Sequence, residues 1–395
     1  MNRFFLKEAV CKPNSSRRNN VFFGWYLMVL TTLFCSCGRN HESASPVLQY
    51  KLIDIPIKFP YLSNYENRIY IIQKDSADIL GAYNHMTNSI DFLDITHQIT
   101  LHSLPLVREG PNGVNGVTAM ALENSSVIVE GMRDFMLIDD SAQVRAKVST
   151  SIIRDSIYMY DGMKEYKIRK SGVTLTNFIS LHYDAANKEL IHNIFPVSEN
   201  SDKRYSGAIG VRINLQDSTV NILPIQYPEK LQQSNEQYES LASPNFTRNG
   251  DLIIYNFPYR SEVYSYHLKT GKCSTYDLRS LYTENEAKSF DDKNASGMDY
   301  TRYEFCALRF ERVHYIKNYN TYVRVHNDSR NNRSEPQSKY LMLINADFKR
   351  MAEYKLPENF TYCLCTENSL YFSVFEKEND DSYLRLAKID LEALL

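Results

Sequence analysis

One polar segment has the residue types and spacing of half a calcium-binding loop. Asp292, Asn294 and Ser296 place oxygen-bearing side chains at alternate positions, and Gly297 follows where such a loop turns sharply. These three residues are therefore candidate calcium ligands. The second half of the loop differs, because Tyr303 stands where a bidentate glutamate is usual. A polar loop within a long insertion is the simpler interpretation, and we expect no cofactor other than this calcium ion.

The chain lacks the common catalytic motifs. G-x-S-x-G, the P-loop, H-E-x-x-H and C-x-x-C are all absent. Gly110, Gly113 and Gly116 have the wrong spacing for a phosphate loop and no predicted helix follows them, so we interpret them as turn glycines. The sequence therefore assigns no catalytic residue.

The cysteines and histidines are distributed in a way that favours packing over metal binding. Cys363 and Cys365 are alternate residues of one predicted strand, so both side chains point to one face. We expect them to be small core residues, because neither has a metal-ligand partner at a useful spacing. Of the nine histidines, only His182 and His314 fall on predicted innermost strands. A metal site would require them to converge from different repeats.

The elements that would position these residues are short strands arranged as repeats. Apolar runs alternate with turn residues over residues 47–388, without a helix-period segment of useful length, which indicates an all-β protein. An asparagine in a polar turn precedes an apolar run at Asn67, Asn124, Asn187, Asn249, Asn320 and Asn368. A strand that ends in a polar residue follows each of them, at Asn84, Asp139, Asn214, His267, Asn345 and Asp390. These interleaved series predict a six-bladed β-propeller of four-stranded antiparallel blades, in which the second landmark ends each third strand.

The two ends of the chain indicate how the propeller closes. Asp390 is followed by only five residues, too few for the outermost strand of a sixth blade. Residues 48–57 alternate well enough to supply that strand. We therefore predict that this N-terminal strand pairs with residues 384–389 and leaves no open sheet edge.

The loops that enter the inner strands are the expected location of a binding site, since propellers bind ligands at the mouth of the channel. The candidate ligand-binding residues in these loops are Arg108, Asn112, Arg302 and Tyr303. Carboxylates such as Asp184, Glu311 and Glu367 lie near predicted inner strands, where a pair could hydrolyse a glycan. Turn and rim charges are the simpler interpretation of these carboxylates, because no pairing signal accompanies them.

The N-terminal segment has the features of a bacterial lipoprotein signal peptide. A basic stretch precedes the apolar run of residues 21–34, which is too short to span a membrane comfortably. The run leads to Ser36-Cys37-Gly38, which resembles a lipobox, where a small residue precedes the lipidated cysteine. We expect residues 1–36 to be removed, Cys37 to carry the lipid, and residues 37–46 to tether a propeller of residues 47–395. An ordinary signal peptide or a short anchor helix is the alternative.

Residues 108–148 resemble a blade of the NHL and TolB-like six-bladed propellers. The likeness rests on the segments Gly-Pro-Asn-Gly at residues 110–113 and Leu-Ile-Asp-Asp-Ser at residues 137–141. Lipobox and propeller together are similar to a family of gut-anaerobe-type lipoproteins of unknown function. This resemblance implies a TolB-like propeller and no established activity.

The charge balance limits the possible partners. The first 36 residues carry five basic residues and one acidic residue, so the remaining chain has 40 basic and 46 acidic residues. This balance argues against nucleic acid, because phosphate contacts need a basic surface. The residues that follow Cys37 lack the acidic cluster of some surface-displayed lipoproteins. This favours an outer-membrane location that faces the periplasm.

These features predict an envelope lipoprotein whose propeller is a non-enzymatic binding module. The expected partner is an envelope protein, a peptide or a glycan, and the lipid anchor is the only expected contact with the membrane. The alternative is a propeller hydrolase that acts on glycans through channel carboxylates. A solute-sensing module for a membrane partner would differ from the first interpretation only in its ligand.

Overall fold

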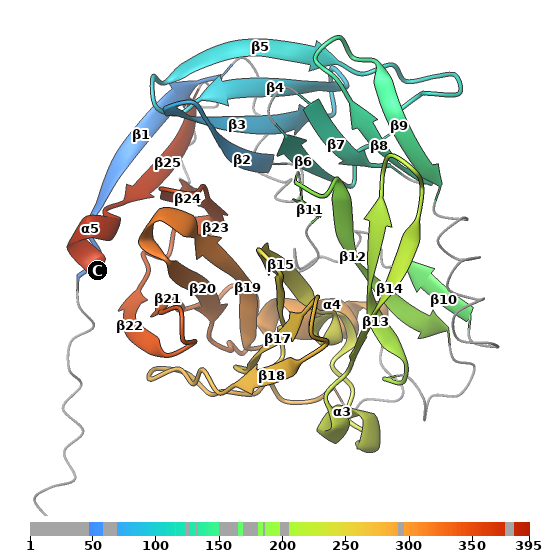
Figure 1. The fold of residues 1–395 in the computed structure, drawn as a ribbon. Coiled ribbons are helices and arrows are strands. Elements are labelled where there is room, and N and C mark those ends of the chain that lie inside the picture. The colour runs from blue at the N-terminus through green and yellow to red at the C-terminus, as the bar shows by residue number, and fades with distance from the viewer. Residues whose placement is uncertain are drawn as a thin grey trace, which may run out of the picture. The chain divides into compact units, whose positions relative to one another are not determined.

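Six antiparallel sheets form a ring in the computed structural model (Figure 1). The structure describes residues 47–57, 69–149 except 115, 124, 125 and 132, 165–168, 181–197 except 185, 205–290, 296–375 and 383–395. All of them belong to a compact unit that extends from Pro46 to Leu395. The predicted lipid-bearing Cys37 lies outside the described residues.

The sheets are the blades of a propeller, each containing a path of four paired strands. Blade 1 contains β2 (Ile69–Lys74), β3 (Ala77–Asn84), β4 (Ser89–Asp94) and β5 (Ile99–Pro105). Blade 2 contains β6 (Ala119–Glu123), β7 (Ser126–Glu130), β8 (Asp134–Ile138) and β9 (Val144–Ser149). Blade 3 contains β11 (His182–Asp184), β12 (Glu189–Val197), β13 (Ala208–Asn214) and β14 (Val220–Gln226), with β10 (Glu165–Ile168) also paired to β12.

The other three blades have the same order of strands. Blade 4 contains β15 (Asn245–Asn249), β16 (Leu252–Asn256), β17 (Val263–His267) and β18 (Cys273–Tyr276). Blade 5 contains β19 (Arg309–Ile316), β20 (Thr321–Asn327), β21 (Lys339–Ile344) and β22 (Arg350–Lys355). Blade 6 contains β23 (Phe360–Cys365), β24 (Leu370–Val374), β25 (Tyr383–Ile389) and, from the other end of the chain, β1 (Tyr50–Pro56).

Strand β1 closes the ring, as the sequence predicted. It pairs with β25 in antiparallel register over its whole length, from Tyr50 opposite Ile389 to Pro56 opposite Tyr383. Its buried side chains pack into the core between blades 6 and 1, where they meet residues of β2 and β3. Asp54 forms an ion pair with Arg385 of β25. The hydrogen bond from that guanidinium lowers the pKa of Asp54.

The asparagine landmarks mark the turns between first and second strands wherever they are described. Asn187, Asn249, Asn320 and Asn368 each lie at the junction between the first two strands of a blade. Asn320 adopts a left-handed conformation with φ of 47°, which asparagine tolerates better than most residues. Asn67 and Asn124 lie outside the described residues. Asn67 precedes β2, the first strand of blade 1, so this landmark comes one strand earlier than predicted.

The second series of landmarks is right for five blades and wrong for the first. In blades 2 to 6 the third strand ends at or next to the predicted residue. In blade 1, however, Asn84 ends the second strand, and the third strand ends at Asp94. The hairpin between these strands has a polar turn of its own, and the Asn84 side chain accepts hydrogen bonds from backbone N–H groups in it. The apolar-then-polar pattern therefore occurs twice in this blade.

The hydrophobic core is divided among the junctions between neighbouring blades. One buried cluster joins blades 1 and 2, a second joins blades 2 and 3, and corresponding clusters follow around the ring to blades 6 and 1. Each strand contributes alternate side chains to the two sides of its blade, as a pleated sheet requires. Consequently the blades hold one another, and their innermost strands surround a central channel.

No helix was predicted from the sequence, yet the described residues contain the short helices α3 (Glu229–Gln233) and α5 (Leu391–Leu394) and one longer helix. Helix α4 (Gly297–Cys306) lies in the long insertion between β18 and β19. Ser296 accepts a hydrogen bond from the backbone N–H of Asp299, whose side chain accepts one in return from the backbone N–H of Ser296. This reciprocal cap stabilises a helix that lacks a strong apolar repeat. None of the helices in the described part of the chain is long and apolar enough to cross a membrane.

Candidate functional site

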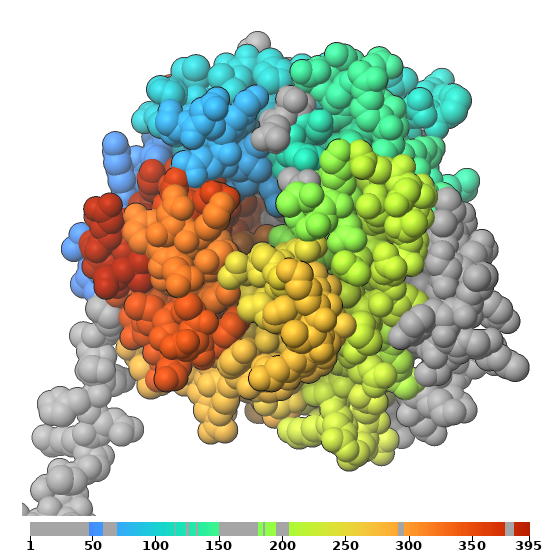
Figure 2. Space-filling model, viewed as in Figure 1, coloured from blue at the N-terminus to red at the C-terminus, as the bar shows by residue number. Residues whose placement is uncertain are grey.

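The central channel contains a cavity of about 1030 Å³. Every blade contributes to its wall, through the end of the innermost strand and the turn that follows. Representative lining residues, in blade order, are Tyr70, Glu123, His182, Arg248, His314 and Cys365. Figure 2 shows a face of the molecule that is hollowed near the centre of the ring. The wall is rich in polar and ionisable side chains.

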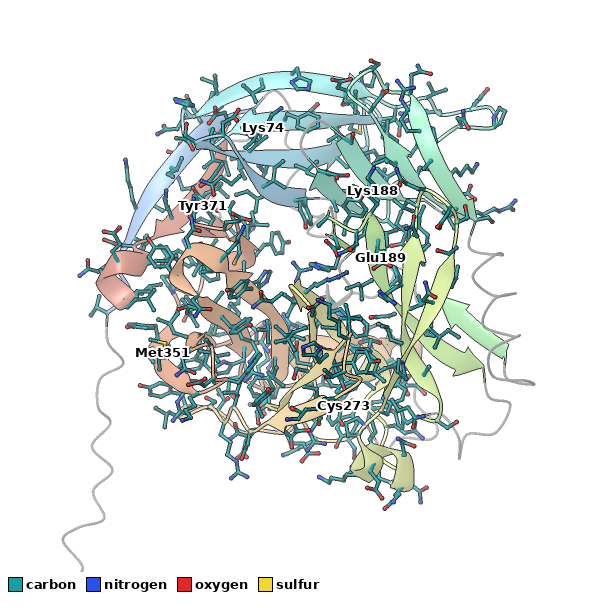
Figure 3. All side chains as sticks on the ribbon, viewed as in Figure 1. Lys74, Lys188, Glu189, Cys273, Met351 and Tyr371 are labelled. Carbon is teal, nitrogen blue, oxygen red and sulfur yellow. The ribbon has the colours of Figure 1, made fainter. Side chains whose placement is uncertain are left out.

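Arg248 of β15 organises one side of this wall. Its guanidinium forms an ion pair with Asp184 of β11 and lies 3.3 Å from a carboxylate oxygen of Glu189 on β12. Glu189 also pairs with Arg212 of β13 at 3.2 Å. These four side chains link blades 3 and 4 next to the channel. Figure 3 labels Glu189 towards the centre of the ring.

Two further ion pairs lie in turns between strands, at the cavity wall. Lys269 lies 2.7 Å from Asp251 in blade 4, and Lys317 of blade 5 lies 3.0 Å from Glu367 of blade 6. The Lys317–Glu367 pair is exposed, so screening by water limits its contribution to stability. Together with Arg248, these lysines provide cationic partners for three of the carboxylates that line the cavity.

His182 is held as a neutral imidazole in the channel wall. Its Nε2 accepts a hydrogen bond from the backbone N–H of Arg248 at 3.2 Å. Burial, aided by the charges of Arg312, Arg248 and His314, lowers the pKa of His182 to about 3. The ring therefore carries its proton on Nδ1 and stays uncharged at neutral pH.

The positive charge of Arg312, on β19, acts on ionisable groups of several blades. This charge opposes the burial that raises the pKa of Tyr70 in blade 1. The same charge acts on His182 in blade 3 and on Cys363 and Cys365 in blade 6. A single guanidinium thus influences ionisable groups on three other blades. The channel is therefore where ionisable side chains from different blades come close to one another.

Cys363, Cys365 and His314 converge on the channel wall. The two Sγ atoms lie 3.9 Å apart, and a ring nitrogen of His314 completes a group whose ligand atoms all lie within 4.8 Å. Burial disfavours ionisation of Cys365, but the hydrogen bond from Cys363 and the neighbouring His314 outweigh it and lower the pKa of Cys365. The shared hydrogen bond and burial raise the pKa of Cys363.

This convergence corrects our expectation that the two cysteines are core residues. Both are partly exposed at the edge of the core, and Cys365 lines the cavity. The sequence placed His314 and both cysteines on inner strands of consecutive blades, which was the available signal. Spacing along the chain concealed the contact, because blades 5 and 6 bring together residues that are about 50 positions apart in sequence.

The predicted ligand-binding residues lie elsewhere. Arg108 and Asn112 are exposed in the loop between β5 and β6, and neither lines the channel cavity. Arg302 and Tyr303 of α4 line a separate cavity of about 990 Å³, where the Tyr303 hydroxyl donates to the carbonyl of Lys288 at 2.9 Å. The structure therefore brings two of the four together, and a ligand-binding role for any of them stays a prediction.

The predicted calcium loop is only partly described. Asp292 and Asn294 lie outside the described residues. The Ser296 hydroxyl takes part in the cap of α4 and lies 2.6 Å from a carboxylate oxygen of Asp299. Calcium binding by these three residues stays a prediction.

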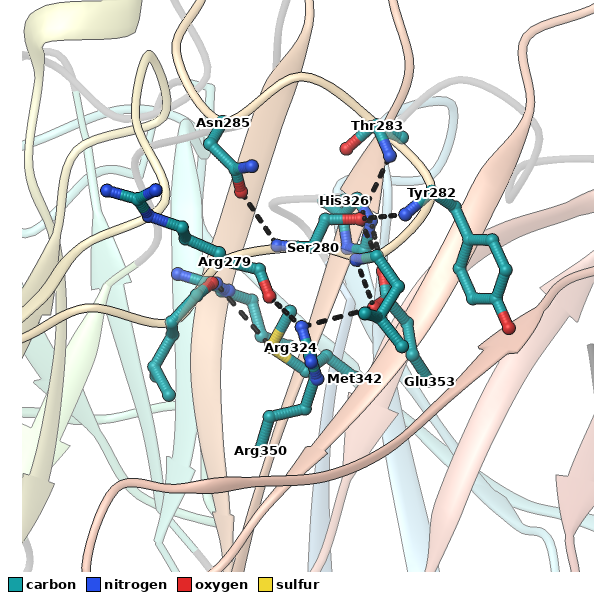
Figure 4. A network of polar contacts seen from close by, with 12 residues as sticks. Arg279, Ser280, Tyr282, Thr283, Asn285, Arg324, His326, Met342, Arg350 and Glu353 are labelled. Atoms are coloured by element: carbon teal, nitrogen blue, oxygen red, sulfur yellow. Dashed lines mark hydrogen bonds and ion pairs between the residues drawn. The ribbon is translucent and has the colours of Figure 1, made fainter. Parts of the chain in front are cut away.

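A second cluster of ionisable residues lies at the junction of blades 4 and 5 (Figure 4). His326 Nε2 lies 2.9 Å from a carboxylate oxygen of Glu353 and 3.1 Å from Ser280 Oγ. Ser280 donates to the same carboxylate at 2.6 Å, and the backbone N–H of Leu281 donates to its other oxygen at 2.9 Å. Nearby, Arg324 donates to two backbone carbonyl groups and packs over an aromatic ring.

This cluster contains the residue types of a serine–histidine–acid triad but not its geometry. In such a triad the serine and the acid contact opposite nitrogens of the imidazole. Here Ser280 and Glu353 both face Nε2 of His326, and Nδ1 has no hydrogen-bond partner among the described residues. The side chains of His326 and Glu353 are also 0% exposed, so no substrate can reach them. The cluster is structural.

The fold and its channel define a six-bladed β-propeller with a polar central cavity. The chain belongs to the family described as a domain of unknown function, DUF4221, whose sequence profile matches residues 47–355. No curated protein matches the chain.

Solved structures also resemble this chain. A member of the DUF4221 family from Bacteroides vulgatus is 15% identical with a TM-score of 0.68, over 87% of this chain and 97% of that one. A protein described as exported, from Bacteroides fragilis, is 9% identical with a TM-score of 0.46, over 89% and 97%. At these identities the similarity concerns the fold alone. The likeness to NHL and TolB-like propellers in particular stays a prediction.

Proposed function

We propose that this protein is a cell-envelope lipoprotein whose propeller binds a short peptide or a glycan in the channel, without catalysis. The observation that carries the proposal is the channel cavity, whose polar wall is assembled from all six blades. Its volume of about 1030 Å³ suits a ligand of a few sugar or amino-acid residues. Cationic, neutral and acidic side chains on one wall offer the mixed hydrogen bonding that such ligands require.

Glycan hydrolysis is less well supported by the same wall. A glycosidase needs one carboxylic acid that donates a proton and a second carboxylate that attacks or activates water. Asp184 and Glu189 converge on Arg248, but both carboxylates are occupied by that guanidinium. Glu367 pairs with Lys317, and Glu311 accepts a hydrogen bond from Asn327. The carboxylates predicted from sequence are therefore engaged as structural partners.

The envelope location rests on the leader sequence. Ser36-Cys37-Gly38 follows a short apolar run, as in a lipoprotein precursor. We expect inhibition of the lipoprotein signal peptidase by globomycin to make the precursor accumulate. A Cys37→Ala protein should remain unprocessed. Recovery of that variant from membranes in a processed form would contradict the anchor.

Binding in the cavity can be tested with soluble fragments of peptidoglycan, which carry both sugar and peptide. Ala186 is exposed in a turn at the cavity wall, so Ala186→Trp should occlude the cavity while leaving the blade junctions intact. Met351 is 49% exposed on β22, an outer strand, and Met351→Trp is the matched control (Figure 3).

We expect calorimetry to detect binding to the wild type and to Met351→Trp, with affinity reduced about tenfold or more in Ala186→Trp. Equal binding by both variants would exclude the cavity as the binding site. Release of new reducing ends from the probe, at a rate reduced in Ala186→Trp, would instead favour the hydrolase.

A further inference from the structure

We propose that His314, Cys363 and Cys365 form a binding site for a thiophilic metal ion of the Zn²⁺ class in the channel wall. The three side chains come from two neighbouring innermost strands, β19 and β23, whose positions are fixed by the ring. Thiolate sulfur and imidazole nitrogen are the ligands that Zn²⁺ prefers in proteins. The proposal does not depend on the identity of the ligand in the cavity, because it concerns the protein's own side chains.

The spacing of the ligand atoms fits a tetrahedral ion. With Zn–S bonds of about 2.3 Å, tetrahedral coordination places two sulfur ligands about 3.8 Å apart. The Sγ atoms of Cys363 and Cys365 lie 3.9 Å apart. The His314 nitrogen lies within 4.8 Å of both sulfurs, and tetrahedral coordination with a Zn–N bond of about 2.0 Å would place it about 3.5 Å from each. The site is therefore nearly formed by the fold itself.

A disulfide between the same cysteines fits the strand less well. Alternate residues of a strand have Cα atoms about 6.6 to 6.8 Å apart, at the upper limit for a disulfide. Closing the bond would also require the two sulfurs to approach from 3.9 Å to about 2.05 Å. A metal ion bridges this separation without moving the backbone of β23.

The surroundings leave one coordination position open to the cavity. Cys365 and His314 both line the cavity, so the side of the ion away from the strands would face it. His182 is another imidazole of the cavity wall, but its Nε2 already accepts a hydrogen bond from the backbone N–H of Arg248. Two thiolates balance the charge of Zn²⁺, and the neighbouring positive charge of Arg312 would favour an anionic or water-derived fourth ligand.

Metal titration of the full-length chain, purified in detergent and reduced, tests the site directly. After treatment with a chelator, Zn²⁺ is titrated against a competing chromophoric chelator, and Co²⁺ is added separately as a spectroscopic probe. We expect one Zn²⁺ per chain, and for Co²⁺ the intense visible bands of tetrahedral coordination with a thiolate charge-transfer band. If wild-type protein neither binds Zn²⁺ in the competition titration nor gives the tetrahedral Co²⁺ spectrum, the proposal is overturned.

Variants assign the ligands. Cys363→Ser combined with Cys365→Ser should abolish the charge-transfer band and weaken Zn²⁺ binding by more than about 100-fold, beyond the usual effect of an outer-shell change. His314→Gln should weaken binding while retaining thiolate charge transfer. Cys273→Ser and His182→Gln remove an exposed thiol and a non-ligand channel imidazole, so they should leave the spectrum unchanged.

Two results would contradict these ligands. One is Zn²⁺ bound with undiminished affinity by the double cysteine variant. The other is a Cys363–Cys365 disulfide in protein isolated without reductant, detected by mass spectrometry after proteolysis. Neither result bears on peptidoglycan-fragment binding, which is read by calorimetry with Ala186→Trp. Failure of the metal site and failure of the proposed binding function can therefore be distinguished.

Discussion

The junctions between blades and the wall of the channel use similar ionisable residues for opposite purposes. At the junction of blades 4 and 5, His326, Glu353 and Arg324 are completely buried and held by short hydrogen bonds. In the channel, His314 and Cys365 are partly exposed and line a cavity. In this protein a candidate functional site is therefore identified by access to the cavity and not by residue type.

The electrostatic consequences also differ between the two regions. Burial lowers the pKa of His326, whereas burial of Glu353 is outweighed by hydrogen bonds from His326, Ser280 and Leu281, which lower the pKa of Glu353. The junction therefore holds a neutral imidazole beside an ionised carboxylate. Substitution of any member of such a group should reduce folding stability strongly, because loss of one partner leaves the other buried and unsatisfied. Channel residues can change with less effect, because water or a ligand can replace a lost partner.

The largest effect should come from removing the strand that seals the junction of blades 6 and 1. Deletion of residues 47–56 removes β1 and the buried side chains of Ile53 and Ile55. Burial of two isoleucines contributes about 3–6 kcal/mol, and the backbone ladder adds to that. We expect more than about 5 kcal/mol of lost stability, measured by urea denaturation. Leu52→Thr on the exposed face of the same strand should change stability by less than about 0.5 kcal/mol.

A smaller but still large effect should follow from Glu353→Ala. The substitution leaves Ser280, His326 and the backbone N–H of Leu281 without their acceptor inside a buried junction. Each buried donor left without an acceptor costs about 1–3 kcal/mol, so we expect a loss of about 3–5 kcal/mol for the three together. Glu367→Ala removes an exposed ion pair beside the channel and should cost less than about 1 kcal/mol. Equal losses in the two variants would contradict the distinction between junction and channel.

The sequence was sufficient to predict the ring because local patterns repeat. The asparagine landmarks, the strand alternation and the strand-like segment at residues 48–57 together predict the blade count and the closing strand. Both landmarks of blade 1, Asn67 and Asn84, come one strand earlier than predicted, and a polar hairpin turn after Asn84 explains that error. Helix α4 was missed because its main signal is a serine cap at Ser296 rather than an apolar repeat.

The channel was not predictable in the same way. Its residues come from six strands, and which side chains meet depends on the angle and register between blades. His314 and Cys365 were both assigned to innermost strands, yet their contact required the geometry of neighbouring blades. Loops entering the inner strands were a reasonable place to look, but the cavity is lined by the turns that leave them.

An intermediate effect should appear in the pH dependence of stability. Unfolded His182 binds a proton near its ordinary pKa of 6.5, whereas in the folded channel its pKa is about 3. Between these values the unfolded state binds more protons, so this contribution is present above pH 6.5 and is lost as the pH falls. The slope can reach about 1.4 kcal/mol per pH unit for one group.

His182→Gln should therefore make the loss of stability between neutral and acidic pH shallower, as measured by urea midpoints across that range. His102 is exposed on β5, outside the channel, so His102→Gln is the matched control and should leave the slope unchanged. An identical slope in wild type and His182→Gln would show that the channel does not keep this imidazole neutral.

The smallest effect should come from Cys365→Ser, which is compared with Leu364→Ala because these adjacent residues of β23 face the two regions separately. Leu364 packs into the core between blades 6 and 1, whereas Cys365 faces the channel. Leu364→Ala should cost about 2–5 kcal/mol through the cavity it leaves. In metal-free, reduced protein, Cys365→Ser should cost less than about 1 kcal/mol, because the new hydroxyl can reach water. Added Zn²⁺ should then stabilise the wild type and Leu364→Ala but not Cys365→Ser, since an ion that binds only the folded state raises its stability. If Cys365→Ser costs as much as Leu364→Ala without metal, the thiol belongs to the junction and the boundary between the two regions must be moved.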